Sequence, residues 1–221
     1  MKRIIFIRTA EYQYKQQGLS LYDSLDAIGL QAAQPPITPP SDATRRRVNA
    51  LLHRYRPTQI FCSEFIRSGQ TAKLFSLPVN TAPQLNEIKF SMNDFSTHRE
   101  LSSNTFEPST INLIRYNFSL ALLSDALYEK QASIMGRISE CASILCALSP
   151  NTTALCCSHG FIMKLYENFF RNMNEPHIFE QIVTAHDWSI APYGFTEGFI
   201  VELSDTVVVK NLTDGLNGAI V

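Results

Sequence analysis

Short apolar runs alternate with amphipathic segments along the chain. Residues 4–7, 60–62 and 153–157 are almost uniformly apolar and rich in β-branched or aromatic side chains. Such runs are typical of strands that are buried on both faces of a parallel sheet. Two further runs, 198–203 and 206–210, predict strands near the end of the chain.

Apolar residues three and four positions apart predict helices between these strands. Ser41 or Asp42 can cap the second helix, and the prolines at 35–36 are expected to end the first. Val79 and residues 85–88 indicate an edge strand with its loop. The predicted helices span residues 25–33, 42–55, 65–75, 111–148 and 161–170.

The order of these elements predicts one α/β domain over residues 1–221. Alternating strands and helices favour a three-layer sandwich with a mostly parallel central sheet and helices on both faces. Residues 91–128 are too long for a simple connection, so we expect them to form a helical cap insertion over one end of the sheet.

Composition and charge indicate a globular protein and argue against nucleic-acid or membrane partners. Hydrophobic residues make up 45% of the 221 residues and charged residues 18%, which suits a buried core. The net charge is -1, and the basic cluster at 45–47 is interpreted as a solvated helix face, so no nucleic-acid partner is expected. The apolar run at 4–7 is too short for a signal peptide, and no segment has the length of a membrane span.

The chain has five cysteines, which is an odd number, and no two of them form a C-x-x-C pair. Most of them lie in apolar surroundings, so we expect reduced thiols buried in the core. Reduced thiols are typical of a cytoplasmic protein. No cluster of ligands with metal-binding spacing is present, and neither a metal nor another cofactor is expected.

Polar residues with phosphate-binding chemistry follow three of the predicted strands. Arg8 follows the first strand, Arg67 lies one turn into the helix after the second, and His159 follows the third. The carboxyl ends of parallel strands meet at one edge of a sheet, where functional side chains gather. Arginine's planar guanidinium matches the oxygens of a phosphate group. The sequence therefore predicts an anion site at this edge.

Four segments in this order resemble the histidine phosphatase superfamily, and most closely its phosphoglycerate-mutase branch. The first is a strand followed by Arg-x-x-Glu at 8–11, and the last is Cys-Ser-His-Gly at 157–160. Between them lie 62–72, with the sequence CSEFIRSGQTA, and 85–90, with the sequence LNEIKF. The resemblance extends from residue 3 to about residue 214 and implies a phosphoglycerate-mutase-like fold.

The resemblance also implies a role for each matching residue. Arg8 and Arg67 match the two arginines that hold phosphate oxygens in the family. His159 matches the histidine that stabilises the transferring phosphoryl group. Glu87 stands where this branch has its general acid, which protonates the leaving oxygen. The implied ligand is a phosphorylated or otherwise anionic small molecule.

Thr9 stands where the family has its nucleophilic histidine, and Ala10 replaces the glycine after it. A neutral imidazole attacks phosphorus directly, whereas a threonine hydroxyl must first lose its proton to a base. No base lies next to Thr9 in the sequence. We therefore expect a pseudoenzyme that keeps its phosphate pocket and has little or no turnover through a phosphohistidine.

Two alternatives stay open: an enzyme that acts on a phosphorylated small molecule by another acid–base mechanism, and a non-catalytic protein-interaction module. His186, which precedes Asp187 and Trp188, is a further candidate, although a structural role is favoured. Lys15 adds a positive charge near the pocket, and His98 falls in the predicted cap. The sequence does not indicate an oligomeric state.

Overall fold

The computed structural model describes residues 1–13, 18–95, 108–173 and 179–212. Within these ranges six strands form one sheet in the order β3-β2-β4-β1-β5-β6. The first four strands in this order are mutually parallel, β5 runs antiparallel to β1, and β6 runs antiparallel to β5. The strands are β1 (Lys2–Arg8), β2 (Gln59–Cys62), β3 (Val79–Thr81), β4 (Thr153–Ser158), β5 (Gly198–Leu203) and β6 (Val207–Asn211).

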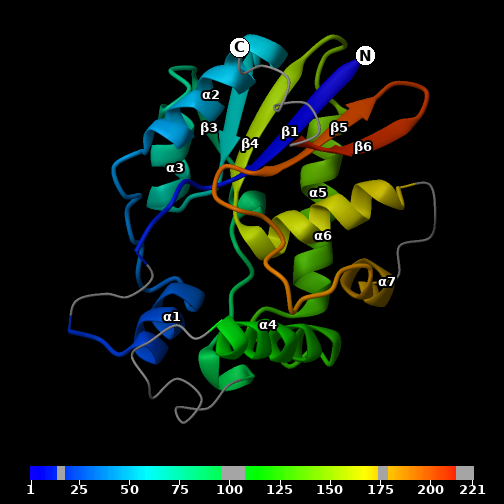
Figure 1. Ribbon diagram of the computed structural model, residues 1–221. Coiled ribbons are helices and arrows are strands. Elements are labelled where there is room, and N and C mark those ends of the chain that lie inside the picture. The colour runs from blue at the N-terminus through cyan, green and yellow to red at the C-terminus, as the bar shows by residue number, and fades with distance from the viewer. Residues whose placement is uncertain (14–17, 96–107, 174–178, 213–221) are drawn as a thin grey trace.

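Helices cover both faces of this sheet, as Figure 1 shows. Helices α2 and α3 lie on one side, and α5 and α6 lie on the other. The helices are α1 (Leu21–Gly29), α2 (Asp42–Tyr55), α3 (Ile66–Lys73), α4 (Pro108–Leu123), α5 (Gln131–Cys146), α6 (Gly160–Arg171) and α7 (Phe179–Thr184), with short 3-10 turns η1 (Pro83–Leu85) and η2 (Met92–Asp94).

The alternation of side chains along β1 explains the two cores. Ile4 and Phe6 are fully buried in the cluster formed with α5 and α6, whereas Ile5 and Ile7 are fully buried against α2 and α3. Successive side chains of a strand point to opposite faces, so a strand between two helical layers must be apolar throughout. The α/β class with a mixed, mostly parallel sheet is therefore confirmed.

The first helix differs from its predicted range of 25–33. It begins at Leu21, because the side chain of Ser20 caps it by accepting a hydrogen bond from the N–H of Asp23. It ends at Gly29, since Gln31 adopts a left-handed backbone conformation with φ of 62°. The helix thus stops before the prolines that were expected to end it.

The long helix predicted over 111–148 is two helices, α4 and α5, separated by seven residues. Asp125 between them has a positive φ of 55°, and its carboxylate accepts a hydrogen bond from the N–H of Gln131 at the start of α5. The edge strand predicted from Val79 and residues 85–88 is β3, whereas residues 85–88 contain the end of η1 and the loop after it. The carbonyl of Leu85 instead accepts a hydrogen bond from the Ser158 hydroxyl.

The predicted cap insertion at 91–128 is described in part, because residues 96–107 lie outside the described ranges. Its described portion contains η2 and α4. Figure 1 places α4, together with α1, beyond the end of the sheet toward which β1 runs. These elements therefore lie on the side where the predicted phosphate-binding residues leave the strands. The single-domain assignment stays a prediction.

Candidate functional site

Three parallel strands end next to one another and bring the candidate residues together. Arg8 of β1 is in register with Ser158 of β4, and Cys62 of β2 is in register with Cys157. The N–H of Thr9 donates to the carbonyl of Ser158 over 3.0 Å. Thr9 and His159, which are the first residues after β1 and β4, therefore lie at the same edge of the sheet.

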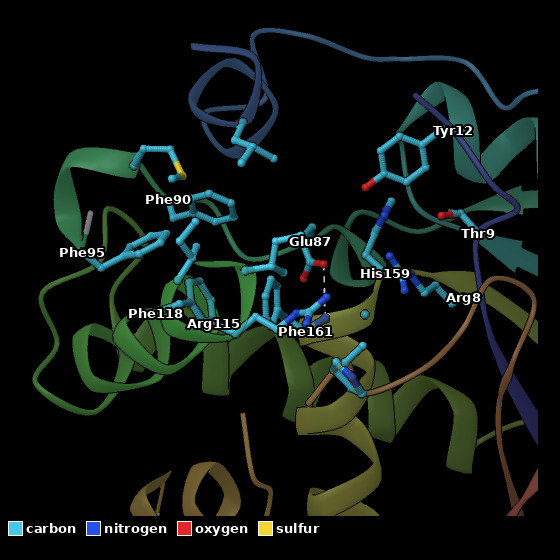
Figure 2. A pocket seen from close by; sticks show the side chains of 17 residues that line it. Arg8, Thr9, Tyr12, Glu87, Phe90, Phe95, Arg115, Phe118, His159 and Phe161 are labelled. Atoms are coloured by element: carbon cyan, nitrogen blue, oxygen red, sulfur yellow. Dashed lines mark hydrogen bonds between the residues drawn. The ribbon is translucent and has the colours of Figure 1, made fainter. Parts of the chain in front are cut away.

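A cavity of about 310 Å³ opens at this edge. Figure 2 shows its polar end, where the side chains of Arg8, Thr9, Glu87 and His159 are gathered around one space, with Tyr12 beside them. Four of the five predicted site residues thus line one cavity. The remainder of the lining is mostly apolar.

The loop before β5 fixes Arg8. The guanidinium Nη1 of Arg8 donates to the carbonyl of Tyr193 over 2.5 Å, and its carbon lies 4.5 Å from the centre of the Phe195 ring. The backbone of Arg8 also donates to Glu197 and accepts from Thr196. A guanidinium held in this way is oriented before an anion arrives, which reduces the cost of ordering it on binding.

A second layer of contacts holds the loop. The Tyr193 hydroxyl donates to the buried carboxylate of Glu167 on α6 over 2.5 Å. The same carboxylate accepts hydrogen bonds from Lys164 and Arg171. The position of Arg8 therefore depends on α6 through the contact between Tyr193 and Glu167.

His159 is 3% exposed, and its Nε2 lies 2.7 Å from the hydroxyl of Ser63. Its ring packs against Phe65 at a centroid distance of 4.6 Å. Burial, followed by repulsion from Arg67 and Arg8, holds the pKa of His159 well below its ordinary value. The imidazole is therefore neutral near pH 7.

Arg67 does not line the cavity. It lies in the first turn of α3 and is 1% exposed. Its guanidinium carbon is 4.7 Å from the centre of the Tyr12 ring and 4.6 Å from that of Phe65. Tyr12 is itself a lining residue, so the guanidinium lies against the ring of a residue of the cavity wall. Its charge still contributes to the pKa shifts of both His159 and Glu87.

The Glu87 carboxylate lies over the N-terminus of α6. It accepts hydrogen bonds from the N–H groups of Ile162 at 2.9 Å and Phe161 at 3.3 Å, and from its neighbour Ile88 at 3.1 Å. Burial raises the pKa of Glu87, although these N–H groups and Arg67 act in the opposite direction. The group is therefore easier to protonate than an exposed glutamate.

Thr9 is buried at 1% exposure but contributes to the cavity wall. The next residue, Ala10, is fixed by a hydrogen bond from its N–H to the Thr71 hydroxyl over 2.9 Å. The hydroxyl of Thr71 donates in turn to the carbonyl of Arg67. The backbone at the position of the family's nucleophile is therefore tied to α3.

Sequence reasoning missed Tyr12 and the apolar part of the lining. Tyr12 follows Arg8 on the same loop, and this closeness could have indicated it. His186 does not line the cavity; its ring lies edge-on to Trp188 at 5.1 Å. Lys15 and His98 lie outside the described residues. The residues missed in the apolar part include Leu25, Phe90, Met92, Phe95, Ile111, Ile114, Phe118 and Phe161.

Within the described ranges, no group of three or more His, Cys, Asp or Glu side chains is arranged to hold a metal ion. No helix in the described part of the chain is long and apolar enough to cross a membrane. All five cysteines are free thiols, and four of them are buried.

The α/β fold thus brings Arg8, Glu87 and His159 to one cavity where β1 and β4 end. Residues 4–206 match the histidine phosphatase superfamily (branch 1), and the chain belongs to this family. A comparison with curated proteins finds no significant match.

Several solved structures share the fold. One is a histidine-to-alanine variant of phosphoserine phosphatase from Entamoeba histolytica in complex with phosphoserine, which is 19% identical over 98% of this chain and 99% of that one, with a TM-score of 0.62. The alpha-ribazole phosphatase from Shigella flexneri is 20% identical over 95% of both chains, with a TM-score of 0.61. A mycobacterial glucosyl-3-phosphoglycerate phosphatase with inorganic phosphate is 13% identical over 96% of this chain and 95% of that one, with a TM-score of 0.58.

Proposed function

We propose that the chain binds a phosphorylated small molecule in this cavity and does not transfer the phosphoryl group to a histidine of its own. The observation on which this depends is the presence of Thr9 in the cavity wall, beside Arg8, Glu87 and His159. In this proposal the guanidinium of Arg8 pairs with phosphate oxygens, and the neutral imidazole of His159 hydrogen-bonds to the phosphate. Arg67 adds positive potential from its place against the Tyr12 ring.

The fixed polar end supports ligand binding. Arg8 is oriented by Tyr193 and Phe195, and His159 by Ser63. Such an arrangement matches what a phosphate site requires, namely donors and positive charge held in place before binding. The histidine-to-alanine variant of the phosphoserine phosphatase holds phosphoserine, so a protein of this fold can bind a phosphate ester after losing a histidine.

The surroundings of Thr9 support the loss of the covalent step. Attack by the hydroxyl oxygen on phosphorus would form a phosphothreonine, expel the ester oxygen and require a base to take the hydroxyl proton. His159 lines the same cavity and is a candidate base, but its Nε2 is hydrogen-bonded to the Ser63 hydroxyl. Removing a covalent nucleophile costs about a million-fold in turnover in a well-studied hydrolase.

The test is to restore the family's residues with the double variant Thr9→His, Ala10→Gly. Hydrolysis of a generic phosphate monoester is measured for both chains, and vanadate binding is measured alongside. We expect both chains to bind vanadate and only the variant to hydrolyse the ester. Turnover by the native chain at rates typical of phosphatases would contradict the proposal, and so would failure of both chains to bind vanadate.

One observation favours acid–base chemistry without a histidine nucleophile as a second candidate: Glu87 has a raised pKa and faces the cavity. The variants Thr9→Val and Glu87→Gln separate the two functions. A native activity that survives Thr9→Val and disappears in Glu87→Gln would favour this candidate. Loss of the activity in Thr9→Val would assign it to the threonine hydroxyl.

A further inference from the structure

The cavity has a second, apolar end that the phosphate-binding residues do not explain. Among the described residues lining this end, α4 contributes a single charged side chain, Arg115, which donates to Asn112 over 3.2 Å. The apolar lining comes from α1, η2, α4, the start of α6 and the loops near them: Leu25, Phe90, Met92, Phe95, Ile111, Ile114, Phe118 and Phe161.

Phenylalanine rings form much of this wall (Figure 2). The ring of Phe118, which is 1% exposed, stacks on Phe161 at a centroid distance of 4.3 Å and an interplanar angle of 24°. Phe90 and Phe95 each meet the Phe118 ring edge-on at 5.5 Å. Phe118 thus anchors three half-buried rings that line the cavity. Rings held in this way form a rigid apolar surface.

The apolar and polar ends meet at the start of α6. Phe161 lies two residues after His159, and its N–H donates to the Glu87 carboxylate over 3.3 Å. Its ring belongs to the apolar wall, while Glu87 and His159 belong to the polar end. A single small ligand can therefore contact both ends, with its phosphate near Arg8 and its organic group against Phe161.

The volume limits the size of this ligand. Ligand pockets span roughly 300–1,000 Å³, so a cavity of about 310 Å³ is at the small end of that range. Apolar walls stabilise apolar groups, and they penalise hydroxyl, ammonium or carboxylate groups that find no partner there. Apart from Arg115, the described lining of this end offers no charged partner to polar organic groups of the phosphoserine type.

We propose that the ligand is a phosphate monoester whose organic group is compact and apolar, such as an aromatic ring system. This inference rests on the proposed function, because it assigns the phosphate to the end formed by Arg8 and His159. It distinguishes this chain from the phosphoserine phosphatase of the same fold, whose structure holds a polar amino-acid ester.

Calorimetric titration of the full chain with five probes tests the proposal. The probes are inorganic phosphate, phosphoserine, phosphoglycerate, naphthyl phosphate and naphthol. We expect naphthyl phosphate to bind at least about tenfold more tightly than each of the other four. Tighter binding of phosphoserine or phosphoglycerate would overturn the inference. Equal binding of naphthol would also overturn it, because the two ends would then not act on one ligand.

Two adjacent positions on α4 provide matched variants. Ile114 is half-buried and lines the cavity, whereas Leu113 is 47% exposed and does not. We expect Ile114→Ser to weaken naphthyl phosphate binding about five- to tenfold and to leave inorganic phosphate binding unchanged. Leu113→Ser should change neither. Equal effects of the two variants on naphthyl phosphate would overturn the assignment of the organic group to this wall.

The two proposals fail in different ways. If no oxyanion binds, the proposed phosphate site itself is wrong. If inorganic phosphate binds but naphthyl phosphate binds no more tightly than phosphoserine, only the assignment of the organic group is wrong. A normal unfolding midpoint for each variant establishes that a loss of binding does not come from a loss of folding.

Discussion

At the scale of single residues, the buried imidazole of His159 links the site to pH. The pKa of His159 is held well below its ordinary value by burial and by the nearby guanidinium groups of Arg67 and Arg8. In the unfolded chain the same imidazole titrates at about 6.5. Below that pH the unfolded state binds a proton that the folded state does not. The folded state therefore loses stability as the pH falls.

We predict that the contribution of His159 to stability is fully present above about pH 6.5 and is lost progressively below it, with a slope of up to about 1.4 kcal/mol per pH unit. Denaturant unfolding at a series of pH values measures this slope. His159→Gln should flatten the curve below pH 6.5. His53→Gln, at an exposed position on α2, is the control and should leave the slope near that of the native chain. Equal slopes for the native chain and His159→Gln would contradict the prediction.

At the scale of elements, the start of α6 depends on a residue from outside the helix. His159 is its N-cap residue and makes no side-chain capping bond. The Glu87 carboxylate instead accepts hydrogen bonds from the N–H groups of Phe161 and Ile162. The first N–H groups of a helix lack partners within it, and a negative charge there interacts favourably with the helix dipole. Glu87 therefore has a structural role besides the acid–base role that the second candidate function gives it.

We predict that Glu87→Ala lowers the free energy of unfolding by about 1–2 kcal/mol, because the N–H groups of Phe161, Ile162 and Ile88 lose their acceptor. Glu87→Gln keeps one acceptor oxygen and should cost about half as much. Denaturant titrations of the three chains at pH 7 measure the difference. Glu140→Ala is the control, since Glu140 is exposed and lies on α5, away from the start of α6. An unfolding free energy that Glu87→Ala leaves unchanged would exclude the capping role.

At the scale of the whole molecule, helical layers on both faces of the sheet bury the cysteines of β2 and β4. Cys62, Cys156 and Cys157 are at most 3% exposed, and burial raises the pKa of each. Burial also raises the pKa of Cys141 on α5 to about 11. Cys146, at the end of the same helix, is half-buried. The thiolate is the reactive form of cysteine. The four buried thiols therefore react slowly for two reasons: a reagent does not reach them, and their raised pKa keeps them protonated.

We predict that a disulfide reagent at pH 7 modifies Cys146 alone on a fast timescale, and that the other four thiols react only as the protein unfolds. Counting modified thiols over time in native buffer and in denaturant measures this. Cys146→Ser should remove the fast phase and leave the slow one. Fast modification of two or more thiols in the native chain would contradict the prediction.

The sequence predicted most elements because their patterns are local. The uniformly apolar run at 4–7 has no exposed face, and Ser41 does cap α2 by accepting a hydrogen bond from the N–H of Thr44. The errors arose where a side chain competes with the backbone pattern. The Asp125 carboxylate starts a new helix inside 111–148, and the positive φ of Gln31 ends α1 early. Neither feature produces a periodic pattern of apolar residues in the sequence.

The sequence by itself determined the family resemblance and the α/β class, and it predicted Arg8, Arg67, Glu87 and His159 as site residues, with Thr9 expected at the nucleophile's position. It could do so because strand ends and motif order are properties of the chain. Only the tertiary structure decided that Arg67 packs against the ring of Tyr12 while the other four line one cavity. It alone assembled the apolar wall, because Phe90, Phe118 and Phe161 come from separate elements that meet through folding.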